Sequence, residues 1–374
     1  MGELSSSFEY GLNAAAKEYD GENKYIRITD IDDESREFKQ EDITSPDTDL
    51  SSAENYKLSE GDILFARTGA SVGKSYIYKA SDGLVYYAGF LIRARIKPEY
   101  NSEFVFQNTL TGDYEKFIKV TSMRSGQPGV NAQEYSQYQI MMPSKPEQDK
   151  ISDCLRNLDN LITLHQRKYD KLQNIKKSML EKMFPKNGSN VPEIRFSGFT
   201  DPWEQRKLGQ LADIVGGGTP STNVSNYWDG DIDWYAPAEI SNQIYLTSSQ
   251  RKITEEGYSN SSAKMLPIGT VLFTSRAGIG KTAILSRKGC TNQGFQSIVP
   301  HEDKLDSYFI FSRTEELKRY GETVGAGSTF VEVSGKQMAN MDLMMPKTLR
   351  EQKVIGQYFQ NLDNLITLHQ RLYF

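Results

Sequence analysis

The chain of 374 residues has few of the side chains that build disulfides, metal sites and catalytic centres. Its only cysteines, Cys154 and Cys290, show no CxxC spacing, so neither a disulfide framework nor a zinc site is predicted. Among its three histidines, His165 and His369 occupy the same position of a repeated segment, which favours helix packing over catalysis. The sequence therefore predicts no metal site and no histidine-based catalytic centre.

Long apolar segments are also missing from the chain. No run of about 18 apolar residues occurs, and the amino terminus lacks a basic-then-apolar signal. We therefore expect a cytoplasmic protein that does not engage a membrane. The net charge of −5 argues against a uniformly basic nucleic-acid-binding surface. Residues 167–186 are a local basic exception, and this run is either a solvated helix face or a surface that faces DNA.

Motifs for nucleotide hydrolysis, methyl transfer and DNA cleavage are incomplete or absent. The segment ARTGASVGKSY at 66–76 has three residues between Gly69 and Gly73, one fewer than a Walker loop requires. The segment FTSRAGIGKTA at 273–283 has Ser275 where that loop needs its first glycine. Neither an N/D-P-P-Y/F quartet nor a PD…(D/E)xK pattern is found. We therefore expect no enzymatic chemistry from this chain itself.

A repeated segment organises the chain. NLDNLITLHQR occupies residues 157–167 and, letter for letter, residues 361–371, an offset of 204. Residues 58–75 also match residues 266–282, so the two Gly-Lys segments are equivalent positions in two copies. The sequences between these anchors are dissimilar. This pattern predicts two variable heads, each followed by a copy of one stem.

The heads and the stems have different periodicities. The heads contain short apolar or aromatic runs broken by turn residues, which predicts strands at 24–31, 62–68 and 86–96, and at 231–237, 269–275 and 294–300. In the stem, apolar residues recur at steps of three or four from Ile151 to Met183, without an intervening proline. A helix between Pro146 and Pro185 would be roughly 55 Å long, which is typical of a coiled-coil spacer.

These patterns define the expected fold class and its parts. We expect an α+β protein with two mixed α/β heads, joined by long antiparallel coiled-coil-like helices in a pseudo-twofold repeat. The expected parts are a first head at 1–146, a stem helix at 147–186, a second head at 187–347, and a shorter second helix at 348–374.

The arrangement resembles the specificity subunits of type I restriction-modification enzymes. The segment GGGTPSTNVSNYWDGDIDWYAPAEIS, residues 216–241, has the GGTPS…YW-G-DI-W…P-A-I pattern of their target-recognition domains. Residues 10–32, YGLNAAAKEYDGENKYIRITDID, are similar to the opening of another class of these domains. The resemblance covers essentially the whole chain.

The resemblance implies a DNA-recognition role without chemistry. Each recognition domain would read one half of a bipartite double-stranded DNA target, and the helices would set the spacing and dock two modification subunits. Those partners would bind S-adenosylmethionine and methylate adenine at N6. Restriction subunits would add ATP- and magnesium-dependent translocation and cleavage. No cofactor is then expected in this chain.

Candidate DNA contacts follow from the chemistry of readout. Arginine pairs with guanine and asparagine or glutamine pairs with adenine, whereas lysine, serine and threonine suit phosphates. Glycine-flanked loops at matched places in the heads supply the candidates: Arg67, Thr68, Ser71, Lys74, Arg124 and Gln127 in the first, and Ser275, Arg276, Lys281, Thr282, Ser328 and Thr329 in the second. Tyr235 and Trp234 are candidates for thymine methyl or DNA backbone contacts, although the core is the favoured place for Trp234.

Two alternatives from other classes stay open. A coiled-coil scaffold without DNA specificity would use the stems to join proteins and would show no selective protection of DNA. A P-loop ATPase would bind ATP tightly as an isolated chain, in spite of the defects in both Gly-Lys segments.

Overall fold

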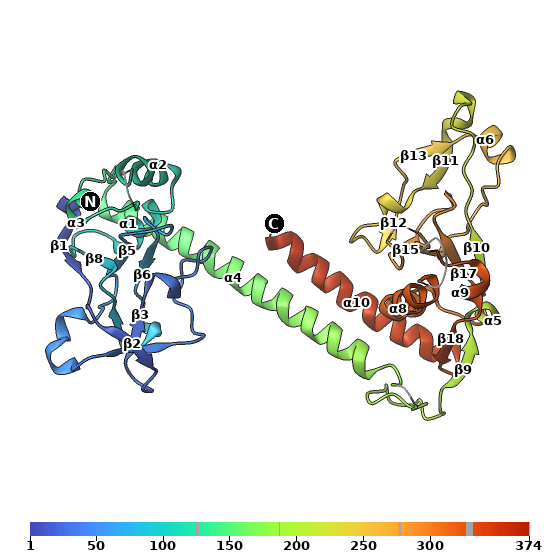
Figure 1. Ribbon diagram of the computed structural model, residues 1–374, viewed down its shortest axis with the longest axis horizontal. Coiled ribbons are helices and arrows are strands. Elements are labelled where there is room, and N and C mark those ends of the chain that lie inside the picture. The colour runs from blue at the N-terminus through green and yellow to red at the C-terminus, as the bar shows by residue number, and fades with distance from the viewer. Residues whose placement is uncertain (124–126, 187, 277, 327–331, 374) are drawn as a thin grey trace. The chain divides into compact units, whose positions relative to one another are not determined.

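The computed structural model describes residues 1–123, 127–186, 188–276, 278–326 and 332–373. The chain forms two compact units, Met1–Leu161 and Ile162–Phe374 (Figure 1). The boundary between the units falls within one uninterrupted helix, α4 (Lys145–Lys182). Each unit contains one of the two expected heads.

A four-stranded antiparallel sheet forms the centre of unit 1. Its strand order is β1-β8-β5-β6, with bounds Ser5–Tyr10 for β1, Leu91–Ile96 for β8, Ile63–Ala66 for β5 and Ser75–Ile77 for β6. Two smaller pairs accompany it: β2 (Ala15–Glu18) with β4 (Thr44–Asp47), antiparallel, and β3 (Lys24–Ile26) with β7 (Val85–Tyr87), parallel. Strands occur in each of the expected regions 24–31, 62–68 and 86–96, although the first strand ends at Ile26 and Ile28–Asp30 forms a 3-10 turn.

Alternation along β5 gives the sheet of unit 1 two buried faces. Ile63 and Phe65 pack against helices α1 (Ser102–Asn108), α2 (Gly112–Thr121) and α3 (Ala132–Ser136). Leu64 and Ala66 point to the opposite face, where the β3–β7 pair and its loops cover them. Side-chain caps begin all three helices, with Asn101, Thr111 and Asn131 each accepting a backbone N–H.

Unit 2 has an equivalent central sheet with one more strand, and different smaller sheets accompany it. Its five-stranded order is β10-β17-β14-β15-β12, with bounds Ala212–Gly216 for β10, Gln296–Pro300 for β17, Val271–Phe273 for β14, Thr282–Leu285 for β15 and Tyr245–Leu246 for β12. A second sheet has the order β13-β11-β16, with bounds Arg251–Ile253 for β13, Trp228–Tyr235 for β11 and Cys290–Thr291 for β16. The last pair is β18 (Asp342–Met345) with β9 (Glu204–Lys207).

The helices of unit 2 follow the same order as those of unit 1. Helices α7 (Ser307–Ser312), α8 (Thr314–Gly325) and α9 (Gly335–Ala339) are equivalent to α1, α2 and α3 by their order after the matched strands. Two short helices, α5 (Leu208–Leu211) and α6 (Glu255–Ser259), are additional. Short 3-10 turns in the two units occupy Gly2–Leu4, Ile28–Asp30, Leu50–Ser52, Glu54–Tyr56, Ala80–Asp82, Ser225–Tyr227 and Pro237–Glu239.

The stems are confirmed as long helices. Helix α4 spans 38 residues, and α10 (Leu349–Tyr373) spans 25. Within unit 2 the last part of α4 runs antiparallel to α10, because His165 contacts His369 whereas Lys176 contacts the earlier Asp363. No helix among the described residues is long and apolar enough to span a membrane.

The same side-chain contact joins each stem to its own head. The Gln148 side-chain oxygen accepts the Asn101 backbone N–H at 3.0 Å, and the Gln352 oxygen accepts the Asp306 N–H at 3.1 Å. Asn101 and Asp306 are the N-caps of the equivalent helices α1 and α7. The repeated glutamine therefore fixes the start of the stem against the same turn in both units.

Candidate nucleic-acid interface

The predicted contact loops of unit 1 meet at one end of its central sheet. Strands β1 and β5 both finish there, whereas β8 and β6 begin there, since Tyr10 pairs with Ile92 and Phe65 pairs with Ser75. The loop after β5 also lies against the later polar loop, through an isolated bridge between Thr68 and Gly129. Residues far apart in the sequence are thus gathered at this end of the strands, which we call the sheet edge.

The Gly-Lys loop of unit 1 uses its backbone N–H groups internally. The N–H groups of Gly69, Val72, Gly73 and Lys74 donate to the carbonyl groups of Pro128, Gly69, Ala66 and Ser71, respectively. A Walker loop must instead direct successive N–H groups at phosphate oxygens. This hydrogen bonding therefore opposes the P-loop alternative.

Gly73 and its counterpart Gly280 show why glycine occupies this place in both copies. Their φ angles are +87° and +95°, a region that other residues rarely adopt. A Cβ atom would also lie 2.7 Å from Ile118 at the first position and 2.4 Å from Lys318 at the second. The glycines allow the loop to pass close to α2 and α8, which explains the resemblance to a phosphate loop without a nucleotide.

Two tyrosines hold the Gly-Lys loop against the sheet of unit 1. The Tyr135 hydroxyl donates to the Ala66 carbonyl at 2.7 Å and accepts the Gly73 N–H at 3.1 Å, while the Tyr114 hydroxyl donates to the Gly73 carbonyl at 2.9 Å. Burial raises the pKa of both tyrosines, so the hydroxyls stay protonated and continue to donate. The loop is therefore firmly positioned.

The prediction that Lys74 contacts DNA is wrong. Its side chain is buried, its ammonium group donates to the Ile31 carbonyl at 3.1 Å, and it forms an ion pair with Asp33. The hydrogen bond with Lys74 lowers the pKa of the Asp33 carboxyl, which keeps the pair charged. Lys74 therefore stabilises the fold of the loop and is not placed to reach a phosphate.

Thr282 and Ser275 need the same correction. The Thr282 hydroxyl is 2.7 Å from that of Thr314, and the equivalent Ser75 and Thr109 hydroxyls are 2.6 Å apart. This repeated pair joins a strand to the connection between α1 and α2 in unit 1 and between α7 and α8 in unit 2, since Thr109 is the C-cap of α1 and Thr314 begins α8. Ser275 is completely buried, with a side-chain oxygen that has no hydrogen-bond partner among the described residues. Neither side chain is exposed for direct readout.

The remaining candidates lie nearer to solvent. Thr68 and Ser71 are partly exposed and Gln127 is exposed at the sheet edge. In unit 2, Arg276 is exposed and forms an ion pair with Glu332 at 2.7 Å, while the exposed Lys281 donates weakly to the Ile240 carbonyl at 3.4 Å. Three candidates lie outside the described residues: Arg124, Ser328 and Thr329.

Trp234 is confirmed as a core residue, and Tyr235 is a correction. The Trp234 indole N–H donates to the Gly218 carbonyl at 2.8 Å inside the β11 region. Tyr235 is also fully buried, and burial raises its pKa to about 12. A contact between Tyr235 and a thymine methyl group is therefore incompatible with this packing.

Arg67 lies close to two aromatic rings that were not predicted as site residues from the sequence. Its guanidinium carbon is 5.1 Å from the Tyr10 ring centroid and 5.9 Å from the Phe90 ring centroid. These rings are unusually accessible, with Tyr10 44% exposed and Phe90 61% exposed. The sequence held one usable signal, since each ring lies beside a glycine at a strand end, in Tyr10-Gly11 and Gly89-Phe90.

Unit 2 has small residues at the three equivalent positions. The Arg67 N–H donates to the Phe90 carbonyl at 3.1 Å, and the Ser275 N–H donates to the Gly294 carbonyl at 2.8 Å, so these backbone pairs correspond. Gly216 takes the place of Tyr10 by strand register. Tyr10 pairs with Ile92, two residues after Phe90, and Gly216 pairs with Gln296, two residues after Gly294. The same frame therefore presents different surfaces.

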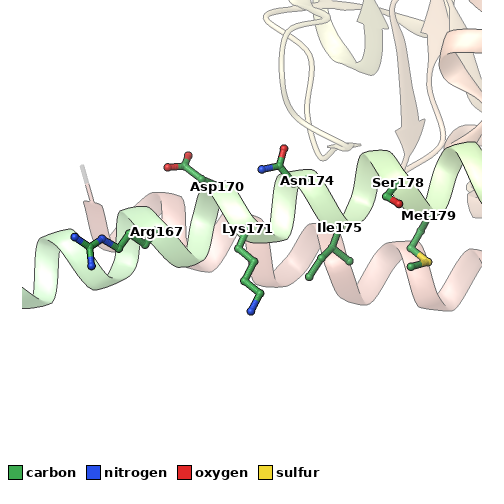
Figure 2. Close-up of a pocket in the computed structure, with 7 residues that line it drawn as sticks. All are labelled: Arg167, Asp170, Lys171, Asn174, Ile175, Ser178 and Met179. Carbon is green, nitrogen blue, oxygen red and sulfur yellow. The ribbon is translucent and has the colours of Figure 1, made fainter. Parts of the chain in front are cut away.

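The stem carries a separate shallow groove along α4 (Figure 2). Its volume is about 540 Å³. The lining residues are Arg167, Asp170, Lys171, Asn174, Ile175, Ser178 and Met179. Basic, acidic, amide and apolar groups alternate there, so the groove has no single ligand chemistry. Among the described residues no cluster of His, Cys, Asp or Glu is arranged to hold a metal ion.

Comparison with known proteins identifies the family. The family model for the type I restriction modification DNA specificity domain matches this chain twice, over residues 10–174 and 200–373. The two matches cover most of the chain and include most of each head. The chain therefore belongs to the family of type I restriction-modification DNA specificity proteins.

Individual relatives agree with this assignment. The chain is 34% identical over 165 residues to the type I restriction enzyme MjaIX specificity subunit of Methanocaldococcus jannaschii, covering 43% of this chain and 38% of that protein. It is 25% identical over 348 residues to the putative MjaX specificity subunit of the same organism, covering 90% of this chain and 77% of that one. The first alignment thus spans well under two thirds of its relative.

A solved structure shows the same fold. The crystal structure of the type I restriction-modification system S subunit from M. genitalium matches with a TM-score of 0.58 and 12% sequence identity. The match covers 98% of this chain and 92% of that one.

Proposed function

We propose that this chain is the DNA-recognition subunit of a type I restriction-modification enzyme and that each head reads one half of a bipartite target. The observation that carries this proposal is the repetition of one sheet frame with different side chains at the same edge. Tyr10, Arg67 and Phe90 at the edge of unit 1 are replaced by glycine, serine and glycine in unit 2. Equivalent frames with unlike surfaces suit two unlike half-sites.

The stems supply the second part of the proposal. Helix α4 is continuous over 38 residues, about 57 Å, and no break interrupts it between the units. We propose that this helix sets the number of unread base pairs between the half-sites. A continuous helix suits that role because its rise per residue is fixed.

Partner docking is proposed for leucines that are exposed in both copies of the stem. Leu161 and Leu164 in α4 are exposed, and so are their counterparts Leu365 and Leu368 in α10. A surface that the repeat presents twice suits two copies of one partner, which we propose to be modification subunits. In this arrangement S-adenosylmethionine, ATP and magnesium act in partner subunits, and this chain contributes recognition.

Selection from a random DNA library tests the proposed function. The chain, purified in complex with its modification subunits, is incubated with the library, and bound DNA is sequenced. We expect two short specific blocks separated by a fixed unread spacer. Binding without sequence preference would instead support the scaffold alternative. Equilibrium dialysis of the isolated chain with ATP provides the separate test of nucleotide binding.

A further inference from the structure

Tyr10, Arg67 and Phe90 form a surface cluster that carries one positive charge. Tyr10 ends β1, Arg67 follows β5 and Phe90 precedes β8, so three separate segments converge at the sheet edge. Among the described residues no carboxylate lies within ion-pair distance of the Arg67 guanidinium. The Arg67 Nε atom is buried and has no hydrogen-bond partner there. A buried donor without a partner costs free energy in the unliganded protein.

The surroundings hold this side chain in place without neutralising it. Both rings lie within about 6 Å of the guanidinium, the range in which a ring face attracts a cation. The Tyr10 hydroxyl accepts the Ala132 N–H at 3.3 Å, which ties the ring to the start of α3. The Arg67 backbone is fixed on both sides, since its N–H donates to Phe90 and its carbonyl accepts the Val130 N–H at 2.9 Å. The guanidinium is therefore preorganised to donate.

The neighbouring groups favour a base edge over a phosphate as the acceptor. Guanine presents N7 and O6 as a pair of acceptors in the major groove, and the arginine fork matches that pair. An exposed phenyl ring gains nothing from a phosphate anion but packs well against base surfaces and thymine methyl groups. Phe90 is 61% exposed and lies beside the guanidinium, so it would meet whatever Arg67 binds.

We propose that Arg67, positioned by Tyr10 and Phe90, reads a guanine in the half-site bound by unit 1. This inference rests on the proposed DNA-recognition function. Unit 2 cannot use the same device, because Ser275, Gly216 and Gly294 occupy the equivalent positions. The next arginine in unit 2, Arg276, is already paired with Glu332. Guanine readout by an aromatic-flanked arginine is therefore confined to one half of the target.

The test maps N6-methyladenine across a host genome that has no other adenine methyltransferase. The host produces the modification subunits with the wild-type chain, Arg67→Gln or Arg67→Lys. Lysine keeps the charge but lacks the planar fork, and glutamine loses the charge and favours adenine. For both variants we expect discrimination at one G·C pair of one half-site to fall roughly ten- to a hundred-fold, while the other half-site stays unchanged.

Several results would overturn the proposal. A uniform loss of methylation with an unchanged motif would show that Arg67 contacts a phosphate. An unchanged motif at full activity, altered bases in both half-sites, or full guanine discrimination by Arg67→Lys would be equally contrary. Phe90→Leu serves as the positioning variant, with a smaller loss of discrimination expected at the same base pair and an unchanged melting temperature. A bipartite wild-type motif in which no G·C pair responds to Arg67 would reject this inference but leave the proposed function intact.

Discussion

The same eleven residues occur in two helices and lie in different environments. In α4, Leu158 is 50% exposed and Ile162 is 45% exposed, whereas the identical positions in α10, Leu362 and Ile366, are 8% and 6% exposed. In unit 2 the later part of α4 packs on α10 through Leu172, Ile175 and Met179. Identical sequence thus produces identical secondary structure in both stems, but the neighbouring segment decides which copy is buried.

The glutamate in the first turn of each stem helix shows the same difference. Glu351 is buried, where its carboxylate accepts from Arg195 at 2.8 Å and from the Trp203 indole N–H at 3.2 Å. Its counterpart Glu147 is exposed. Both partners of Glu351 come from the connection that enters the second head. The same glutamate therefore contributes to the stability of unit 2 through buried contacts that its exposed copy in unit 1 lacks.

The largest expected effect comes from truncating one leucine at each copy of the repeat. Leu362→Ala should lower the free energy of unfolding by about 2–4 kcal/mol, because it opens a cavity in a packed core. Leu158→Ala should change it by less than about 0.5 kcal/mol, because that side chain is half exposed. Urea unfolding of the full chain measures both variants. Equal destabilisation by the two substitutions would show that the copies are packed alike.

The glutamate pair gives the next effect in size. Glu351→Gln should lower the free energy of unfolding by about 1–3 kcal/mol, because the substitution removes the charge that faces the largely buried Arg195. The hydrogen bond with Glu351 raises the pKa of Arg195, so in the variant Arg195 keeps its charge and loses its ion-pair partner. Glu147→Gln is the matched control and should have no measurable effect. Thermal unfolding in low salt compares the two, and a similar loss in both would contradict the assigned environments.

The leucines that are exposed in both copies should affect binding and not folding. Leu164→Glu in α4 and Leu368→Glu in α10 should each weaken association with a modification subunit about ten-fold, since a charge would enter an apolar contact. The melting temperature of the isolated chain should stay constant. Analytical ultracentrifugation of the mixtures measures the stoichiometry. If two modification subunits still bind each variant with wild-type affinity, these leucines are not the docking surface.

The smallest expected effect concerns the histidine pair. The Nδ1 atoms of His165 and His369 are 2.9 Å apart, so one ring donates and the other accepts. Burial, Lys168 and His165 lower the pKa of His369. The unfolded chain then binds a proton at His369 more readily than the folded chain does. The contribution of His369 to the free energy of unfolding is therefore complete above about pH 6.5 and declines as the pH falls below that value.

A pH series of melting temperatures, from 7.5 to 5.5, measures this decline. In His369→Gln the same series should be flatter, because glutamine holds no titrating proton. A wild-type slope that persists unchanged in the variant would assign the pH dependence to other groups.

Much of the fold was predictable because it depends on repetition and periodicity. The eleven-residue match and the spacing of apolar residues from Ile151 to Met183 predicted the stems, and short apolar runs predicted β5, β8, β14 and β17. The helix ends at Lys182 rather than continuing to residue 186. Exposure of one copy and burial of the other could not be predicted, because the pattern of the helix itself is the same.

The interface was harder to predict than the fold. Arg67, Thr68, Ser71 and Gln127 do share one edge, but whether they contact DNA stays a prediction. Lysine, serine and threonine in a polar loop suggest solvent, yet Lys74, Thr282 and Ser275 are buried through contacts with distant segments. Aromatic residues suggest a core, yet Tyr10 and Phe90 are exposed. Residue type alone does not reveal these long-range packing choices.

If the heads read the bases and the stem sets their spacing, a four-residue insertion in α4 should change the spacing alone. Four residues added between Asp153 and Asn157 lengthen the helix by roughly 6 Å and nearly preserve its facing, about the length of two base-pair steps. Methylation mapping of the complex with modification subunits should show both half-site sequences unchanged and an unread spacer longer by about one or two base pairs. An active variant that reads new bases within a half-site at the original spacing would show that the stem does not set the spacing.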